Sequence, residues 1–514
     1  MERRHRSVPV LHGARRNRRT DAPPESSTDR ERGLVMKHVD VIVIGCGAAG
    51  LASAVSILEH SPGAQLLVLE RASVRHRGGN TAWTSSFFRT TAEGDPSIDF
   101  VERMHSLSEG RTPSEHIDAL ALGCRQTIEW LSGTHDIRFV TDNTYFLTSK
   151  GPRLMPQGGG ASIVEKLVQS AERLGAQFRY ESKVIGLARL DEGWEVTIDG
   201  PDGAYDVRAA HVVVAAGGFE GSPDLRKRYL GPTAEAMRTI APGGNYNDGA
   251  CIELAVHNGA ARGGQYDRFH GEPTDARSTR PEALVMAYPY GIVVDSHGRR
   301  FLDEGSDSPD NTFEELAYRI WRDAHQSAYL IADSRLLDIV GIDRAILTDR
   351  PPYTASTVAG LAERIDVPVD ELEWTITRFN DACTTGEFDP HSCDGLSTQG
   401  LLPPKSNWAR PLTEAPFLAW PLACVITFTF GGLATDASGR VLDTAGSAVP
   451  GLYAVGESAG IYYNTYPGAT SVLRALNGGR LLGSTIATAA IIPTEDAAPQ
   501  PLSSDRDRMS SHPA

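Results

Sequence analysis

The hydrophobic pattern of the chain is clearest between residues 39 and 70. A mostly apolar run, Val39–Ile44, ends at a Gly-Cys-Gly-Ala-Ala-Gly turn, and an Ala-rich segment follows it. A second apolar run, Leu66–Leu69, ends at the acidic Glu70. Apolar runs of this length are typical of strands buried on both faces of a parallel sheet. The pattern therefore predicts a strand, a glycine turn, a helix and a second strand.

The three glycines of this turn have the spacing of a dinucleotide site. Gly45 permits the tight turn, Gly47 lets a pyrophosphate approach the backbone, and Gly50 lets the helix pack closely on the strand. The amides and dipole of the first helical turn then face the phosphates. Glu70 lies twenty residues beyond Gly50, where an acid can accept hydrogen bonds from ribose hydroxyls. A glycine-rich turn in some other α/β unit would leave this acid unexplained.

The later pattern predicts two α/β regions separated by an insertion. Short strands, loops and helices without a parallel-sheet rhythm run from about Pro242 to residue 415, and α/β character returns with the strand and glycine turn of Gly451–Glu457. We therefore predict an α/β protein whose Rossmann-like, glutathione-reductase-type nucleotide domain is split in sequence by an inserted α+β capping domain. The predicted parts are a disordered basic extension (1–35), the nucleotide domain (36–245 and 416–495), the capping domain (246–415) and a disordered tail (496–514).

Composition and charge narrow the functional class. The chain has 514 residues with a formal net charge of −15, which gives no whole-protein basis for binding nucleic acid. Its six cysteines are scattered without a CxxC pair, so we expect no metal framework and a reduced, cytoplasmic protein. No apolar run approaches the roughly 20 residues that cross a bilayer, so we expect no integral membrane segment.

Several motifs resemble those of the fumarate reductase and succinate dehydrogenase flavoprotein family, over about residues 38 to 490. Within it, three further segments look most like the tricarballylate dehydrogenase branch, and soluble 3-ketosteroid dehydrogenases are similar as well. The family motifs are Gly45–Gly50, Glu70, Gly78–Thr81, Ala216–Glu220, Gly451–Glu457 and the capping signature Arg299–Glu304; the branch segments are Asp303–Gly305, Thr427–Gly432 and Tyr466–Thr470.

The resemblance implies FAD as the cofactor. Membrane-bound members carry a His at the position of Asn80 and attach the flavin through it; Asn has no nucleophilic ring nitrogen, so we predict non-covalent FAD. Glycine turns and their neighbours form the predicted contacts: Gly45, Gly47, Ala48, Ala49, Gly50, Glu70, Arg71, Gly79, Asn80, Thr81, Lys183, Val184, Ala216, Gly217, Gly456, Glu457, Ser471 and Val472.

Dehydrogenation beside a carboxylate or ketone needs a group that holds the substrate, a group that takes the α-proton and a flavin that accepts hydride. By resemblance, Arg480 binds a carboxylate and Tyr466, with a backbone N–H, polarises a carbonyl. The alternatives are a surface Arg on a helix and a Tyr packed in a tight turn. The candidates for proton transfer are Tyr288, Tyr290, His270 and Arg300; a structural His and an Arg300 paired with Glu304 or Asp303 are the simpler interpretations.

Two substrate-binding residues of fumarate reductases are missing. The stretch Ser306–Asn311 holds no Arg, and Phe428 stands where those enzymes have a His before a Thr-Met-Gly-Gly run. Fumarate reduction is therefore disfavoured, and a larger or less charged substrate fits better, with Phe428 and Phe430 either lining an apolar wall or serving as core.

These features predict an FAD-dependent dehydrogenase that desaturates, or reduces, the C–C bond beside a carboxylate or ketone. A tricarballylate-like acid is the favoured substrate, and a 3-ketosteroid or cyclic ketone is the alternative. A non-enzymatic nucleotide-sensing module would not need the second glycine loop at Gly456. With neither a CxxCH haem motif nor an iron–sulfur cysteine set in the sequence, we expect an external electron acceptor: a quinone, a membrane electron-transfer protein or oxygen.

Overall fold

The computed structural model describes residues 38–489, so the predicted extension (1–35) and tail (496–514) lie outside the described residues. The first lobe is built on an 8-stranded sheet in which β17, β8, β1, β2 and β5 are neighbours and run parallel. The strand β16 pairs antiparallel with β17, and the β6–β7 pair joins at β8. The strands are β1 (His38–Ile44), β2 (Leu66–Leu69), β5 (Gln177–Arg179), β6 (Lys183–Arg189), β7 (Trp194–Gly200), β8 (Gly203–Val214), β16 (Arg440–Leu442) and β17 (Ala448–Ala454).

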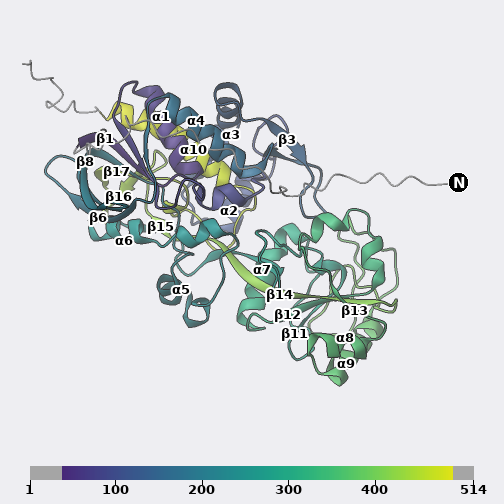
Figure 1. Ribbon diagram of the computed structural model, residues 1–514. Coiled ribbons are helices and arrows are strands. Elements are labelled where there is room, and N and C mark those ends of the chain that lie inside the picture. The colour runs from purple at the N-terminus through teal and green to yellow at the C-terminus, as the bar shows by residue number, and fades with distance from the viewer. Residues whose placement is uncertain (1–37, 490–514) are drawn as a thin grey trace, which may run out of the picture. The chain divides into compact units, whose positions relative to one another are not determined.

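Helices and short segments complete the first lobe (Figure 1). Segments far apart in the sequence meet here, because β17 and α10 come from the end of the chain. The elements are α1 (Ala48–His60), η1 (Gly79–Trp83), α2 (Phe100–Leu107), α3 (Ser114–Thr134), β3 (Phe139–Asp142), β4 (Arg153–Pro156), α4 (Gly159–Arg173), α5 (Pro223–Leu230), η2 (Pro232–Ala234), η3 (Pro242–Tyr246), α6 (Ala250–His257), β9 (Arg262–Gly263), β15 (Gly432–Leu433), η7 (Gly456–Ser458) and α10 (Ser471–Thr488).

Small residues set the close packing of α1. A Cβ at Gly50 would lie 2.0 Å from the carbonyl oxygen of Gly45, and one at Gly479 of α10 would lie 2.7 Å from the carbonyl oxygen of Ala49. A Cβ at Gly483 would likewise lie 2.2 Å from Ser56 Oγ. Only glycine allows α1 to approach both the turn after β1 and α10 this closely.

The second lobe is built on a 5-stranded sheet in the order β10-β14-β12-β11, with β13 also paired to β14. The long strand β14 pairs with β10, β12 and β13, so residues 417–429 lie in this sheet and not, as predicted, in the second part of the nucleotide domain. The elements are β10 (Phe269–Asp275), η4 (Tyr288–Tyr290), β11 (Ile292–Asp295), α7 (Pro309–Arg322), β12 (Ala328–Ala332), η5 (Ser334–Asp338), η6 (Ile342–Ala345), β13 (Tyr353–Ala355), α8 (Val358–Ile365), α9 (Val369–Ala382) and β14 (Phe417–Thr429).

An apolar stripe docks α7 on this sheet. Phe313, Leu316, Ala317 and Ile320 recur at helical spacing and are all buried. Burial of each large side chain of this kind contributes about 1.5–3 kcal/mol.

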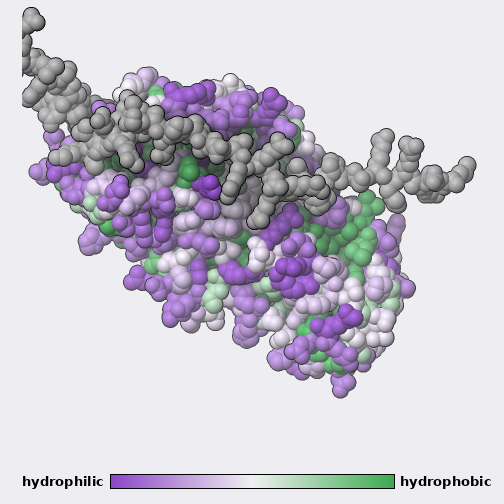
Figure 2. Space-filling model, in the orientation of Figure 1, coloured by the Kyte–Doolittle hydropathy of each residue, from purple (hydrophilic) through white to green (hydrophobic). Residues whose placement is uncertain are grey.

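Purple, hydrophilic residues predominate over green, hydrophobic ones on the face seen in Figure 2. No helix among residues 38–489 combines the length and the apolar character that a membrane crossing requires.

Candidate active site

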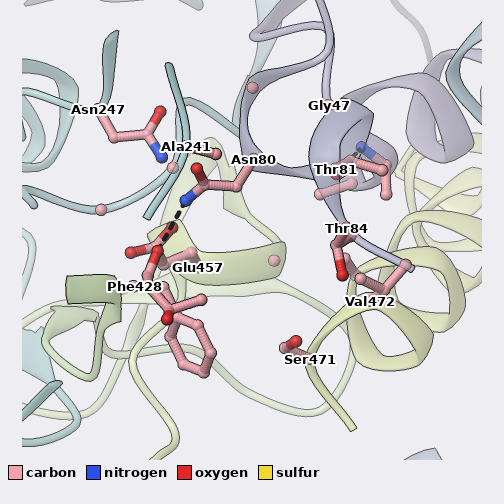
Figure 3. Close-up of a pocket in the computed structure, with 18 of the residues that line it drawn as sticks. Gly47, Asn80, Thr81, Thr84, Ala241, Asn247, Phe428, Glu457, Ser471 and Val472 are labelled. Atoms are coloured by element: carbon pink, nitrogen blue, oxygen red, sulfur yellow. Dashed lines mark hydrogen bonds between the residues drawn. The ribbon is translucent and has the colours of Figure 1, made fainter. Parts of the chain in front are cut away.

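A single cavity runs from the turn after β1 to the second lobe and contains nearly every predicted cofactor residue. Gly47 and Thr81 lie on one side of the view in Figure 3, and Asn247 and Glu457 lie on the other. Gly50 is the exception, because it packs against Gly45 and does not line the cavity. The others all line it: Gly45, Gly47, Ala48, Ala49, Glu70, Arg71, Gly79, Asn80, Thr81, Lys183, Val184, Ala216, Gly217, Gly456, Glu457, Ser471 and Val472. Their contact with FAD stays a prediction.

The glycine turn leaves the N-terminus of α1 open to the cavity. Gly45 has φ +107°, and a Cβ there would lie 2.3 Å from the carbonyl oxygen of Ala215. The amide of Ala48 donates to Thr81 Oγ1 at 3.1 Å, which ties the start of α1 to η1. The chain thus has a backbone cradle for an anionic group at a helix N-terminus.

Glu70 braces this turn from within. Its Oε2 accepts from the amide of Cys46 at 3.0 Å and its Oε1 from the amide of Ala72 at 2.7 Å. Burial raises the pKa of Glu70 although these hydrogen bonds oppose the rise. Asp248, which also lines the cavity, forms ion pairs with Arg71 at 2.7 Å and with Lys183 at 2.9 Å. Sequence reasoning missed Asp248, because no local motif marks it.

Two neighbouring acids lie at the cavity: Glu220 is buried, and Glu457 lines the cavity. Asn80 Nδ2 donates to Glu220 Oε1 and to the carbonyl of Thr427, both at 2.8 Å, and Asn247 Nδ2 donates to the same Glu220 oxygen at 2.6 Å. Glu457 Oε1 accepts from the amide of Thr429 at 2.8 Å. Burial raises the pKa of Glu220 and of Glu457, and the neighbouring Glu457 adds to the rise at Glu220.

Unpartnered polar atoms around the cavity fit a large polar cofactor. Asn80 Oδ1, Thr427 Oγ1 and two nitrogens of Arg474, Nε and Nη1, are buried without a hydrogen-bond partner, and all three residues line the cavity. Buried polar atoms are rarely left unpaired in proteins. Here they supply an acceptor, a hydroxyl and two cationic donors to a ligand, as the ring and ribityl groups of FAD require.

Aromatic side chains line the end of the cavity toward the second lobe. The ring of Tyr466 lies 4.4 Å from that of His270 and 5.0 Å from that of Phe428, measured between centroids. The Tyr466 hydroxyl accepts from the amides of Thr470 and Ser471, each at 2.9 Å, and donates to Ser471 Oγ at 3.0 Å. Tyr466 is thus held at the N-terminus of α10 beside an apolar wall.

His270 lines the same end but has no free lone pair. Its Nδ1 lies 2.8 Å from Glu314 Oε2 and its Nε2 lies 3.1 Å from Glu272 Oε1. Burial alone would lower the pKa of His270, but the hydrogen bonds to Glu272 and Glu314 raise it to about 10. Both nitrogens donate in that form, so His270 is an unsuitable general base.

An ionic cluster joins the lobes at the rim of this end. Asp310 of α7 lies 3.2 Å from Arg89, 3.3 Å from Arg153 and 3.8 Å from Arg103. Burial alone would raise the pKa of Asp310, but Arg153, Arg89 and Arg103 lower it below its ordinary value. The charge of Arg153, which lines the cavity, is therefore already paired.

Four predicted catalytic candidates lie outside the cavity and are corrected here. Arg480 faces α3, where it donates to Thr127 Oγ1 at 3.1 Å and to Gln126 Oε1 at 3.2 Å. Arg300 donates to Glu304 at 3.0 Å, which agrees with the simpler interpretation that Arg300 is paired with an acid of its own segment. The hydroxyl of Tyr288 shares a hydrogen bond with that of Thr312 at 2.6 Å, and burial raises the pKa of Tyr288, which makes it a poor base. Tyr290 bonds the carbonyl of Pro390.

The family model described as FAD binding domain matches residues 40–473. The chain is 24% identical to vinyl phenol reductase of Lactiplantibacillus plantarum, over 83% of this chain and 91% of that protein. It is 29% identical to 4-oxocyclohexanecarboxylate 2-dehydrogenase of Sinomonas cyclohexanicum, over 64% of this chain and 61% of that protein.

Solved structures show the same fold. An open flavocytochrome c3 fumarate reductase superposes with a TM-score of 0.70 at 20% identity, covering 92% of this chain and 83% of that one. The 3-ketosteroid-Δ4-(5α)-dehydrogenase of Rhodococcus jostii RHA1 superposes with a TM-score of 0.67 at 24% identity, covering 90% of this chain and 99% of that one. The predictions of FAD and of an oxidoreductase are confirmed. The chain belongs to the FAD binding domain family that includes the fumarate reductases, and it is an FAD-dependent oxidoreductase acting on C–C bonds.

Proposed function

We propose that the chain dehydrogenates a cyclic or similarly apolar ketone at the C–C bond beside its carbonyl. The observation that carries this proposal is the Tyr466 hydroxyl, held by two backbone amides against the rings of His270 and Phe428. Relatives named for oxocyclohexane carboxylates and a neighbour named for ketosteroids support the same substrate class.

The charges of the cavity disfavour the tricarballylate-like acid that we first expected. Glu272, Glu282 and Asp310 line the end near Tyr466, and Arg153 there is paired with Asp310. Arg480, the expected carboxylate ligand, faces α3. A tricarboxylate would therefore lack the arginine that was expected to bind it, whereas a neutral ketone needs no such partner.

The chain's own groups explain how a carbonyl would be activated. The two amides that donate to the Tyr466 oxygen polarise its O–H bond, which makes the proton a better hydrogen-bond donor. When a ketone binds, this proton can turn from Ser471 Oγ to the carbonyl oxygen and stabilise the charge that develops there. Bound FAD supplies the hydride acceptor for the β-carbon.

We also propose that FAD is held without a covalent bond. Asn80 offers no nucleophile, and its Nδ2 is occupied by Glu220 and Thr427. The Oδ1 atom of Asn80 is left to accept a hydrogen bond from the cofactor.

Ligand binding to the holoenzyme tests the substrate class. A cyclic enone should perturb the visible flavin spectrum, and Tyr466→Phe should weaken its binding about tenfold, the equivalent of one hydrogen bond. Tricarballylate should bind far more weakly to both proteins. Tight tricarballylate binding, together with enone binding that is unchanged in Tyr466→Phe, would contradict the proposal.

A further inference from the structure

Glu282 is an acid in the cavity that the sequence analysis did not single out. It precedes a short bridge between Thr274 and Leu284 and lines the cavity near Glu272. Its backbone has φ +54°, a left-handed conformation that costs free energy for a residue with a side chain. Such conformations persist where the surroundings enforce them and are concentrated at functional sites.

Glu282 ends a row of hydrogen bonds that crosses between the lobes. The Tyr145 hydroxyl donates to Ser85 Oγ at 2.9 Å, and Ser85 Oγ donates to Glu282 Oε2 at 3.2 Å. The amide of Ser85 also approaches Glu282 Oε1 at 3.4 Å. Every donor in this row points toward the carboxylate, which holds it in the form that can accept a proton, and both hydroxyls can rotate to carry that proton outward afterwards.

The surroundings of Glu282 suit proton transfer near neutral pH. Burial and then the negative charge of Glu272 raise the pKa of Glu282 to about 7, and hydrogen bonds from Ser85 and Thr84 partly oppose this rise. Burial also raises the pKa of Tyr145, so that hydroxyl stays protonated and remains a donor. A base whose pKa lies close to the working pH transfers protons most effectively.

The other polar groups at this end are engaged elsewhere. Both nitrogens of His270 contact carboxylates, and the Tyr466 oxygen already accepts hydrogen bonds from two backbone amides. The Asp310 carboxylate is bound by arginines, which lower its pKa. Glu272 is paired with His270 at 3.1 Å, so among residues 38–489 Glu282 is the acid at this end that has no cationic partner, and Ser85 and Tyr145 give its proton a hydrogen-bonded path.

We propose that Glu282 takes the proton from the carbon beside the substrate carbonyl and, once the hydroxyls of Ser85 and Tyr145 have turned, passes it along them to solvent at the partly exposed Tyr145. This role rests on the proposed ketone dehydrogenation. The α C–H bond breaks, its proton goes to the carboxylate, and its electron pair becomes part of the new C=C bond. The β-hydrogen leaves with its electron pair to FAD, the oxidant, so that an enone and two-electron-reduced cofactor are formed.

The test compares Glu282→Gln with Glu371→Gln as the matched control, since Glu371 lies on α9 outside the cavity and pairs there with Arg299. Two readouts are used on holoenzyme under anaerobic conditions: exchange of the ketone α-hydrogens into D2O by NMR, with the cofactor already reduced by dithionite, and the rate of flavin reduction by ketone. FAD content is measured in each protein.

In Glu282→Gln we expect both rates to fall at least 100-fold at unchanged FAD content, within the usual range for a general base. In the wild type and in Glu371→Gln the reduction rate should rise with pH through about 7, as the carboxylate form of Glu282 accumulates, and this rise should vanish in Glu282→Gln.

The two proposals fail in different ways. If ketones reduce the wild-type flavin and Glu282→Gln exchanges and reacts within threefold of it, the role of Glu282 is overturned while the proposed function stands. If no cyclic ketone reduces the wild-type flavin or exchanges its α-hydrogens, the proposed function is overturned, and the role of Glu282 falls with it.

Discussion

Replacing Asp310 with Asn should loosen the second lobe from the first. Asp310 lies on α7 and its three arginine partners lie in the first lobe at 3.2 to 3.8 Å. At an effective dielectric constant of 20, each such contact corresponds to about 4–5 kcal/mol of Coulomb attraction. Repulsion among the arginines and the cost of dehydration offset much of this sum. Because Arg103 and Arg153 would lose this ion-pair partner and Arg89, which is only 4% exposed, would keep only Asp99, we expect a loss of about 3–5 kcal/mol in the free energy of unfolding.

The assay is urea unfolding at neutral pH, followed by fluorescence, with Asp118→Asn as the control for an exposed acid on α3. Since the pKa of Asp310 is lowered in the fold, its contribution is present above the ordinary Asp value and disappears as the pH falls through the lowered one. The difference between Asp310→Asn and wild type should therefore shrink in acid. A loss below about 1 kcal/mol at neutral pH would refute the reasoning.

Three further experiments test the cofactor site and its surroundings. Gly50→Ala, whose Cβ would lie 2.0 Å from a carbonyl oxygen, should lower FAD content at least tenfold, whereas Gly133→Ala, with open space around its Cβ, should not. Arg480→Ala should leave KM for substrate within threefold, while Tyr466→Phe should lower kcat/KM by about 10²–10³; a tenfold rise in KM would restore a substrate role for Arg480. The contacts with Glu272 and Glu314 raise the pKa of His270, so the wild type should have a larger free energy of unfolding than His270→Gln. This difference should be at its full size below pH 6.5 and disappear as the pH rises through about 10. A difference that does not change with pH would exclude a charged His270.

Local sequence signals predicted the cofactor end of the cavity well. Gly45, Gly47 and Glu70 belong to one continuous strand–turn–helix–strand segment, so their spacing alone determines how they meet. The structure keeps this arrangement and adds that both Glu70 oxygens accept backbone amides.

The substrate end could not be predicted in the same way. Arg474 and Arg480 both lie on α10, but six residues turn a helix by about 600°, which leaves their side chains about 120° apart. Arg474 therefore lines the cavity while Arg480 faces α3. Glu282 and Tyr145 come from segments that only the fold brings together, and no short motif marks either of them.

Anaerobic mixing of the purified holoenzyme with a cyclic ketone tests the central claim most directly. The account predicts that the visible flavin absorbance bleaches within a single turnover, that the matching enone appears by NMR in equal amount, and that acid afterwards releases the flavin from the protein. Bleaching by tricarballylate but by no ketone, or flavin that stays attached to the denatured chain, would contradict it.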